Sequence, residues 1–234
     1  QAKNIIFASF IQLNSINSGA SRPKDIAPSK VQKLGILGAG MMGQGIAYCA
    51  AVAGIDVVLK DMSMDAAEKG KAYTGKVFDK QIKRGRKTEE GKQAALSRIV
   101  ATDSYDVLKG CDLIIEAVFE DVGVKRTVTE EAEPCLVEGG VFASNTSALP
   151  ITQLAEASQK PENFVGMHFF SPVDKMPLIE LIGGEKTSDE TLAKAFDFAR
   201  QIKKTPIVVN DAPGFFTSRV FGSFLDEGSR MLHE

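Results

Sequence analysis

The chain has 234 residues, of which 44% are hydrophobic, so it is long enough to fold around a sizeable core as one large domain or slightly more. Its formal net charge is −2 and its isoelectric point is near 5.9, which excludes nucleic-acid binding through overall positive charge. The sequence contains no apolar run as long as the roughly 18 residues that a membrane-spanning helix needs, so none is predicted.

The first segment, residues 1–30, is expected to be a short apolar helix followed by a linker rich in Ser, Pro and Gly. The sequence starts at Gln1 without the layout of a signal peptide, and it stops inside a predicted helix. We therefore expect it to be a piece of a longer chain.

From Val31 onward, apolar runs alternate with amphipathic helical stretches. This alternation predicts an α/β domain over residues 31–210, with a doubly wound, mostly parallel sheet covered by helices on both faces. The expected strands are 33–37, 56–60, 112–117, 140–143, 164–170, 178–182 and 205–209, and the expected helices are 41–53, 64–85, 122–136 and 189–203. Residues 211–234 have a helical apolar period and are expected to form the first helix of a C-terminal all-helical domain that continues beyond them.

The first predicted strand is followed by the glycine pattern G-x-G-x-x-G, formed by Gly38, Gly40 and Gly43. In a strand–turn–helix unit these glycines permit a tight turn, the approach of a diphosphate, and close packing of helix on strand. Asp61 ends the next strand, 18 residues beyond Gly43, where a carboxylate accepts both ribose hydroxyls and repels a 2′-phosphate. The pattern predicts a Rossmann-type site for NAD(H), with Met42 as a further cofactor contact.

Ligands of an open parallel sheet bind beyond the carboxyl ends of its strands, so the polar residues that follow each strand are the candidates for chemistry. His168 lies near the end of one predicted strand, and Glu180 lies on the next apolar run. If these two strands are neighbours, the carboxylate orients the imidazole as a general base; the alternative is a core histidine bonded to a carbonyl. Ser147 follows another strand, although it would serve equally as the N-cap of a helix that starts at Pro150. His233, the only other histidine, is expected to be inert.

Three further features give weaker predictions. Cys49, Cys111 and Cys135 have no paired or metal-like spacing and are expected to be buried thiols in a reducing compartment. No His, Cys and carboxylate cluster has ligand spacing, so no metal is expected. The basic stretch 80–92 is either a solvated helix face or a patch for a phosphorylated ligand.

Five stretches in register carry a resemblance to a known family: GILGAGMMGQGIA, IIEAVFED, ASNTSALPI, GMHFFSPVDKMPLIELI and DAPGFFTSR. From Val31 to its end, the chain resembles the L-3-hydroxyacyl-CoA dehydrogenase family. The resemblance is closest to the dehydrogenase part of multifunctional fatty-acid oxidation proteins of the mitochondrial trifunctional type. Residues 1–30 resemble the linker that joins an enoyl-CoA hydratase part to this dehydrogenase part.

The resemblance implies that (3S)-3-hydroxyacyl-CoA is oxidised to 3-oxoacyl-CoA while a hydride passes to NAD⁺, a step of fatty-acid β-oxidation. It implies that His168 is the general base and that Glu180 orients it. Ser147 would hydrogen-bond the substrate and the nicotinamide region. Glu120 would contact the cofactor, and Lys125 would contact both the cofactor and the acyl-CoA.

Two positions depart from the single-function members, many of which have Asn where this chain has Ser171 and Ser218. Ser171 is a candidate cofactor contact and Ser218 a candidate substrate contact, and the shorter hydroxyl would lose the amide's contacts or bridge them by water. The family's C-terminal helices normally complete the acyl-CoA cleft. The chain by itself is therefore expected to bind NAD(H) but to turn over substrate poorly.

The resemblance also implies partners and a location. The expected partners are a thiolase β-subunit and the hydratase part of the same chain. The expected location is mitochondrial, in the matrix or at the inner membrane. Whether the protein forms homo-oligomers is left open. Two other functions compete: a catalytically silent NAD-binding or structural relative, and a dehydrogenase of free 3-hydroxy acids. The presence of His168, Glu180 and Ser147 argues against the first. The absence of a lysine at the position of His168 argues against the second, because such enzymes more often use a lysine base.

Overall fold

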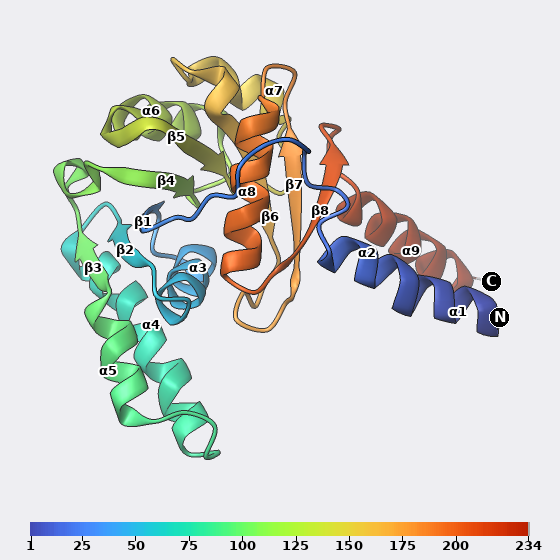
Figure 1. Ribbon diagram of the computed structural model, residues 1–234, viewed down its shortest axis with the longest axis horizontal. Coiled ribbons are helices and arrows are strands. Elements are labelled where there is room, and N and C mark those ends of the chain that lie inside the picture. The colour runs from blue at the N-terminus through green and yellow to red at the C-terminus, as the bar shows by residue number, and fades with distance from the viewer. Residues whose placement is uncertain (234) are drawn as a thin grey trace.

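A single sheet of eight strands forms the centre of the computed structural model, which describes residues 1–233, with the side chains of 2, 8, 9 and 17 left aside. The strand order is β3-β2-β1-β4-β5-β6-β7-β8 (Figure 1). Neighbouring strands are parallel except for β6 and β7, so β7 and β8 run against the other six. The strands are β1 Lys33–Leu37, β2 Asp56–Lys60, β3 Ile99–Thr102, β4 Cys111–Glu116, β5 Leu136–Ser144, β6 Phe164–Phe169, β7 Leu178–Gly183 and β8 Thr205–Asn210.

Helices cover both faces of this sheet, because its central strands are apolar on both sides. Residues of α3, α4 and α8 pack into the core on one face, and residues of α6 and α7 pack into the core on the other. The predicted doubly wound α/β fold is thereby confirmed. The helices are α1 Ala2–Ile6, the π-helix η1 Phe7–Gln12, α2 Leu13–Asn17, α3 Met41–Val52, α4 Met64–Ile82, α5 Glu89–Ser97, α6 Val122–Ala132, α7 Ile151–Leu154, α8 Asp189–Gln201 and α9 Thr217–Met231, with short 3₁₀ turns η2 Tyr105–Leu108, η3 Glu133–Cys135, η4 Ala155–Ala157 and η5 Pro161–Asn163.

Two elements were not predicted, the edge strand β3 and the helix α5 that precedes it. The strand has only four residues, with one of them exposed and one half-buried. The helix is mostly polar, and Ala95 is its one fully buried residue. Its start is instead fixed by a cap, since the Thr88 hydroxyl accepts a hydrogen bond from the Gly91 N–H at 3.2 Å.

The segment that joins the N-terminal helices to β1 is held against α8. Arg22 forms a two-pronged ion pair with Asp197, at 2.7 Å from Nε and 2.9 Å from Nη2. The same carboxylate accepts a hydrogen bond from the Ser29 N–H at 2.9 Å, and Gln201 exchanges two hydrogen bonds with the backbone of Val31. Side chains of one helix therefore fix the path of this segment across the domain.

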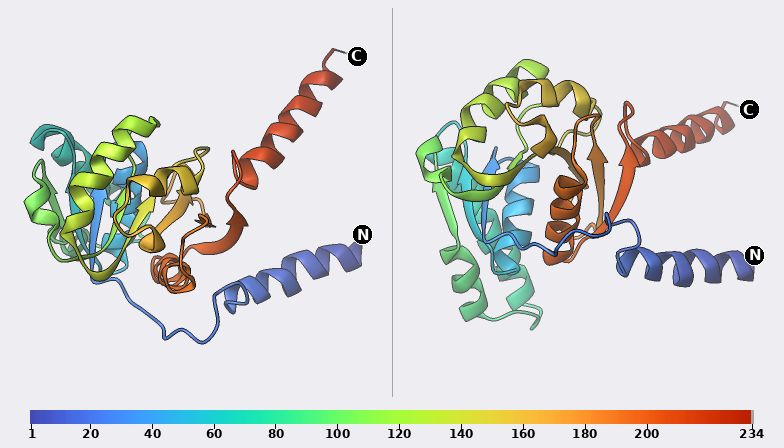
Figure 2. Two further views of the ribbon diagram at one scale, coloured as in Figure 1. Left: turned by 90° about the horizontal axis from the view of Figure 1, so that it is seen from above. Right: turned by 45° about the horizontal axis from the view of Figure 1, so that its top comes forward.

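The helices at the two ends of the described chain project away from the sheet (Figure 2). Their large apolar side chains are mostly exposed. In α9, for example, Phe224 is 73% exposed and Met231 is 68% exposed. The fold of residues 31–210 buries most of its large apolar side chains in its own core, whereas these two helical segments leave most of theirs uncovered within the described residues.

Candidate active site

Six parallel strands bring their carboxyl ends to one edge of the sheet, and two hollows adjoin there. The larger has a volume of about 770 Å³ and the smaller about 320 Å³, and both are lined by Ala117 and Val118, which follow β4. The larger is also lined by Gly38, Gly40, Lys60, Asp61, Met62, Tyr105, Phe119 and residues of α6. The smaller is also lined by Met42, Glu120, Asn145, Ser147, His168, Phe169, Phe170 and Ser171. Most of the residues singled out in the sequence therefore lie around one continuous crevice.

The glycine turn between β1 and α3 has the geometry that a bound diphosphate needs. Gly38 has a φ of +93°, which L side chains rarely adopt. A Cβ at Gly43 would lie 1.8 Å from the Gly38 carbonyl oxygen, whereas a Cβ at Gly40 would meet nothing within 4 Å. The turn is thus closed on the side of the strand and open on the side of the crevice, and no described side chain caps the first N–H groups of α3.

Asp61 stands directly after β2, at the mouth of the larger hollow. Its carboxylate accepts a hydrogen bond from the Ala39 N–H at 2.6 Å and another from the Met62 N–H at 2.7 Å. These bonds fix the carboxylate against the glycine turn, where the ribose next to a bound diphosphate would lie. Lys60 Nζ lies nearby, 4.0 Å from the centre of the Tyr105 ring.

His168 and Glu180 are partners across the antiparallel pair β6–β7, so the expected contact between the two strands is present. His168 Nδ1 lies 2.7 Å from Glu180 Oε2, and the side chains are 8% and 0% exposed. Because a carboxylate only accepts hydrogen bonds, Nδ1 carries the proton, and Nε2 is the ring nitrogen left to act toward the smaller hollow. The rings of Phe170 and Phe215, with centroids 4.5 Å and 5.8 Å away, keep the imidazole in place.

The other carboxylate oxygen of Glu180, Oε1, is bound by backbone N–H groups at the start of α9. It accepts hydrogen bonds from the Thr217 N–H at 2.8 Å and from the Phe216 N–H at 3.2 Å. Burial by itself raises the pKa of the Glu180 carboxyl, but the hydrogen bonds from His168 and Thr217 outweigh it and hold the pKa below its ordinary value. Glu180 is therefore an ionised carboxylate, which is hydrogen-bonded to the imidazole on one side and to the N-terminus of a helix on the other.

Ser147 lies on the loop after β5, exposed and facing the same hollow as His168. Glu120, from the loop after β4, accepts the Ser147 N–H at 3.0 Å and the hydroxyl of Thr146. Burial raises the pKa of Glu120, but Thr146, Lys125 and the Ser147 N–H together lower it below the ordinary value. Asn145 ties the loop to β6, because its side-chain oxygen accepts the Phe169 N–H at 2.9 Å.

Lys125 does not reach the surface of the crevice. It is 2% exposed, and its ammonium lies 2.8 Å from Glu116 Oε1 and 3.1 Å from Glu120 Oε2. Glu116, the last residue of β4, is fully buried and also accepts the hydroxyl of Ser144. Burial raises the pKa of Glu116 above that of an ordinary carboxyl, even with Lys125 beside it. The contact of Lys125 with acyl-CoA stays a prediction.

The remaining candidate residues, Ser171 and Ser218, are both exposed side chains. Ser171 lines the smaller hollow and is exposed, with its hydroxyl 3.5 Å from Met41 Sδ. Ser218 is exposed on the first turn of α9, one residue after the Thr217 N–H that holds Glu180. It does not line the hollow around His168.

The interpretation of Ser147 as an N-cap is wrong. Helix α7 begins at Ile151, and its first N–H groups are bound by Asp211, which comes from the loop after β8. The distances are 2.7 Å to the Ile151 N–H and 2.8 Å to the Thr152 N–H. This cap could not be predicted from local sequence, because its acceptor lies 60 residues further along the chain.

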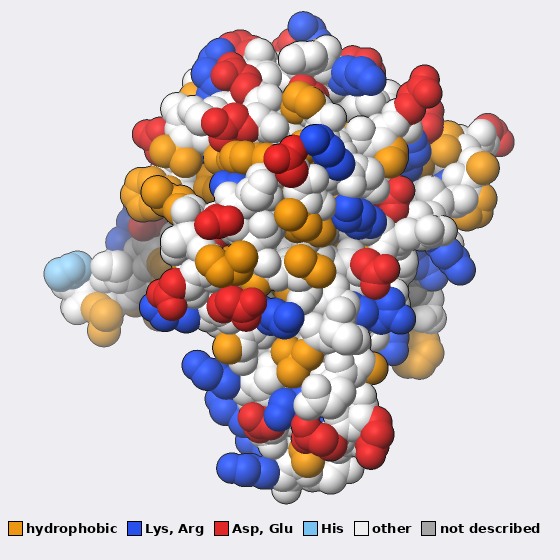
Figure 3. All heavy atoms as spheres, turned by 90° about the vertical axis from the view of Figure 1, so that its left-hand side faces the viewer, with side chains coloured by type: hydrophobic (Ala, Val, Ile, Leu, Met, Phe, Trp, Pro, Cys, Tyr) orange, Lys and Arg blue, Asp and Glu red, His pale blue; other side chains and the backbone are white. Residues whose placement is uncertain are grey.

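The basic stretch 80–92 covers the tip of the hairpin between α4 and α5, which projects from the domain and appears at the bottom of Figure 3. Its side chains are mostly exposed, and acidic side chains lie among them. Lys92, for example, pairs with Asp79 at 2.7 Å. None of these basic residues lines either hollow, so a role in phosphate binding stays a prediction.

Cys111 and Cys135 are buried and Cys49 is half-buried, all three as free thiols. Burial raises the pKa of each thiol, that of Cys111 to about 12. Within residues 1–233, no group of three His, Cys, Asp or Glu is arranged to hold a metal ion. No described helix is both long and apolar enough to cross a bilayer.

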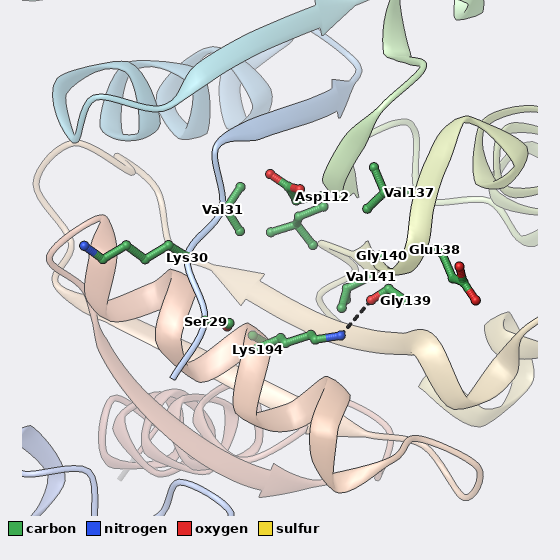
Figure 4. Close-up of a pocket in the computed structure, with 12 residues that line it drawn as sticks. Ser29, Lys30, Val31, Asp112, Val137, Glu138, Gly139, Gly140, Val141 and Lys194 are labelled. Carbon is green, nitrogen blue, oxygen red and sulfur yellow. Dashed lines mark hydrogen bonds between the residues drawn. The ribbon is translucent and has the colours of Figure 1, made fainter. Parts of the chain in front are cut away.

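A further hollow of about 200 Å³ lies at the opposite, amino end of the sheet, where the linker crosses β4 and β5 (Figure 4). Two of the charged residues that line it, Asp112 and Lys194, already have hydrogen-bond partners within the chain. Asp112 accepts the N–H groups of Gln32 and Lys33, at 2.7 Å and 2.9 Å, and Lys194 donates to the Gly139 carbonyl at 2.8 Å. These contacts hold the chain together, and we assign the site to the carboxyl edge.

Comparison with known proteins assigns the family. Residues 33–212 match the family model described as the NAD-binding domain of 3-hydroxyacyl-CoA dehydrogenase. The chain belongs to the 3-hydroxyacyl-CoA dehydrogenase family. Its NAD-binding domain therefore occupies most of the described residues, and its cofactor is NAD.

Relatives and solved structures of this dehydrogenase family agree with the assignment. The chain is 41% identical over 225 residues to the fatty acid oxidation complex subunit alpha of Idiomarina loihiensis, covering 96% of this chain and 31% of that protein. It resembles the (S)-3-hydroxybutyryl-CoA dehydrogenase of Ralstonia eutropha with a TM-score of 0.82 and 41% identity, over 85% of this chain and 70% of that one. It also resembles the dehydrogenase part of multifunctional enzyme 1 from C. elegans, with a TM-score of 0.76 and 26% identity, over 96% and 54%. The chain spans about a third of the curated relatives that it matches.

Glu116 and Ser144, which shape this dehydrogenase site, were not singled out in the sequence, whereas Asn145, Thr146 and Asp211 were expected only as polar residues that follow a strand, without their hydrogen-bond partners. Most of them follow a strand at the carboxyl edge, which was the available signal. Their polar partners come from other strands and loops, so the sequence did not reveal these hydrogen bonds.

Proposed function

We propose that this chain oxidises the C3 hydroxyl of a (3S)-3-hydroxyacyl-CoA to a ketone, with NAD⁺ as the hydride acceptor. The observation that carries the proposal is the buried pair of His168 Nδ1 and Glu180 Oε2, 2.7 Å apart, beside a hollow continuous with the dinucleotide crevice. Oxidation of a secondary alcohol needs a base for the hydroxyl proton and an acceptor for the hydride, and this arrangement supports both at one edge of the sheet.

The chain's own residues fit the cofactor. The open glycine turn and the free N–H groups at the start of α3 would hold the diphosphate, and Asp61 would accept the ribose hydroxyls. Met42, Glu120 and Ser171 line the part of the crevice where the nicotinamide end would lie. When bound, NAD⁺ supplies the site that accepts the hydride from C3.

The proton chemistry belongs to His168. In our proposal Nε2 takes the proton of the substrate hydroxyl, while Glu180 keeps the proton on Nδ1 and stabilises the imidazolium that forms. The Ser147 hydroxyl lines the same hollow and would hold the substrate oxygen toward the imidazole. The walls of Phe169 and Phe170 limit the access of water to the ring.

The test is substitution of His168 by Ala. In a chain extended to the length of its relatives, we expect kcat for NADH formation from 3-hydroxybutyryl-CoA to fall about 10²–10⁴-fold, which is the range for losing a positioned acid–base group. The affinity for NADH, measured by fluorescence titration, should stay within about twofold, because the imidazole lies in the smaller hollow and the ribose site in the larger. A variant that keeps wild-type kcat would remove His168 from the mechanism.

The longer protein is part of the same proposal. We propose that residues 1–30 are the linker after a hydratase part, that 31–210 are the NAD-binding domain, and that 211–234 begin a helical domain. The length covered in the relatives and the uncovered apolar side chains of α9 support this division. A thiolase subunit as partner, a mitochondrial location and poor turnover by the chain alone stay predictions. Turnover by this chain at the level of a chain extended to the length of its relatives would contradict the last of them.

A further inference from the structure

The ammonium of Lys125 lies beneath the loop that carries Ser147, out of reach of solvent. It donates to both oxygens of Glu116, at 2.8 Å and 2.9 Å, and lies 3.1 Å from Glu120 Oε2. Glu116 is in turn fixed by the hydroxyl of Ser144 and by the Val118 N–H. Lys125 is thus a bridge between one fully buried carboxylate and one that is 39% exposed, and it lines neither hollow of the crevice.

The second of these carboxylates, Glu120, connects Lys125 to the loop that carries Ser147. While Oε2 of Glu120 faces Lys125, its Oε1 accepts the Thr146 hydroxyl and the Ser147 N–H. The Thr146 hydroxyl oxygen then accepts the N–H groups of Ala148 and Leu149, at 3.3 Å and 3.0 Å. The Thr146 N–H itself donates to the Ser144 hydroxyl oxygen. Four consecutive backbone amides, those of residues 146–149, therefore depend on Glu120 or on the Ser144 and Thr146 hydroxyls, which bond the two carboxylates that Lys125 bridges.

We propose that Lys125 is a positioning residue, which holds Glu120 and through it the backbone that presents the Ser147 hydroxyl beside His168. Glu116 has the same task one step further away, because it supplies the buried counter-charge that holds the Lys125 ammonium, 2.8 Å from Glu116 Oε1. This inference rests on the proposed function only for the role of Ser147. The positioning itself is measurable without turnover.

The test compares the exchange rates of the amides of residues 146–149 by hydrogen–deuterium exchange in wild type, K125M and the double variant E116Q/K125M. In K125M we expect exchange to accelerate about tenfold or more, because Glu120 loses the cation that holds it over the loop. K125M also leaves Glu116 buried without a counter-charge, which lowers stability everywhere. The double variant removes that charge, and its melting temperature should recover. Its loop amides should still exchange about tenfold faster than those of the wild type, because Glu120 remains unanchored.

The variant R22M is the matched control, since it removes the cation of a different ion pair, the partly buried one between Arg22 and Asp197 of α8. It should lower the melting temperature and leave exchange at residues 146–149 unchanged. Recovery of wild-type loop protection in the double variant would overturn the proposal, because Lys125 would then serve only to neutralise Glu116. In a chain extended to the length of its relatives, we expect K125M to lower kcat about tenfold at unchanged KM. A raised KM for acyl-CoA with unchanged kcat and loop exchange would instead indicate direct substrate contact and overturn it.

The experiments distinguish failure of the proposed function from failure of the positioning role of Lys125. A loosened loop in a protein that oxidises no 3-hydroxyacyl-CoA would contradict the proposed function and support the positioning of the loop. Normal oxidation with an unaltered loop in both variants would contradict the positioning role alone.

Discussion

Replacing Glu180 with Gln tests the centre of the proposed mechanism, because the two side chains have the same shape. The carboxylate accepts three hydrogen bonds, from His168 Nδ1 at 2.7 Å, the Thr217 N–H at 2.8 Å and the Phe216 N–H at 3.2 Å. A glutamine has one accepting oxygen and one donating NH₂ group, so it cannot replace all three bonds unless another group changes.

Two orientations of the amide are available to the variant. With its oxygen toward His168, its NH₂ group faces the two N–H groups of α9, which leaves buried donors unpaired at about 1–3 kcal/mol each. With its oxygen toward α9, its NH₂ group donates to Nδ1, and the imidazole proton moves to Nε2. The second orientation pairs every group and is the one we expect. It deprives the base of its accepting nitrogen, so kcat should fall about 10³–10⁴-fold while most of the stability is kept.

The assay is NADH formation from 3-hydroxybutyryl-CoA and longer 3-hydroxyacyl-CoAs, in a chain extended to the length of its relatives. E180Q, H168A and the double variant should be measured together with their melting temperatures. Because Glu180 acts through His168, the double variant should be no slower than H168A alone. A kcat of E180Q within about twofold of wild type, or additive losses in the double variant, would refute the reasoning.

Three further predictions concern the cofactor site and the effect of acid. Asp61→Ala should weaken NADH binding about tenfold, by loss of hydrogen bonds to the ribose, and should bring the affinities for NADH and NADPH closer together; an unchanged preference in fluorescence titrations would remove Asp61 from the ribose site. Gly43→Ala should lower NADH affinity at least tenfold and destabilise the domain by about 1–3 kcal/mol in urea unfolding, because its Cβ would lie 1.8 Å from the Gly38 oxygen. Gly40→Ala, whose Cβ would meet no protein atom within 4 Å, should keep wild-type stability and serves as the matched variant. The depressed pKa of Glu180 contributes stability that is complete above its unfolded pKa of about 4.3 and is lost as the pH falls through the lower folded value, so the difference in melting temperature between wild type and E180Q should shrink below about pH 4; a constant difference from pH 7 down to about 3 would contradict the assigned shift.

Much of the fold could be predicted, because long apolar runs and helical periods are local properties of the chain. The bounds of β1 and β2 were predicted to the residue, and β7 and β8 each extend one residue further than expected. The edge strand β3 and the polar helix α5 were missed, because few of their residues are buried. The path of the linker across α8 was also missed, since Arg22 meets its partner Asp197 only in the folded domain.

Part of the candidate site could likewise be predicted from local sequence, and part of it depended on the tertiary structure. The glycine turn is a local motif with fixed spacing, so the sequence alone predicted a dinucleotide site there, a histidine near the end of one strand and a serine after another. Only the tertiary structure decided that β6 and β7 pair in the register that sets Glu180 on His168, that α9 donates to the far side of that carboxylate, and that Lys125 is buried. The physical reason is that hydrogen bonds and ion pairs between distant segments depend on strand order and register, which no short stretch of sequence encodes.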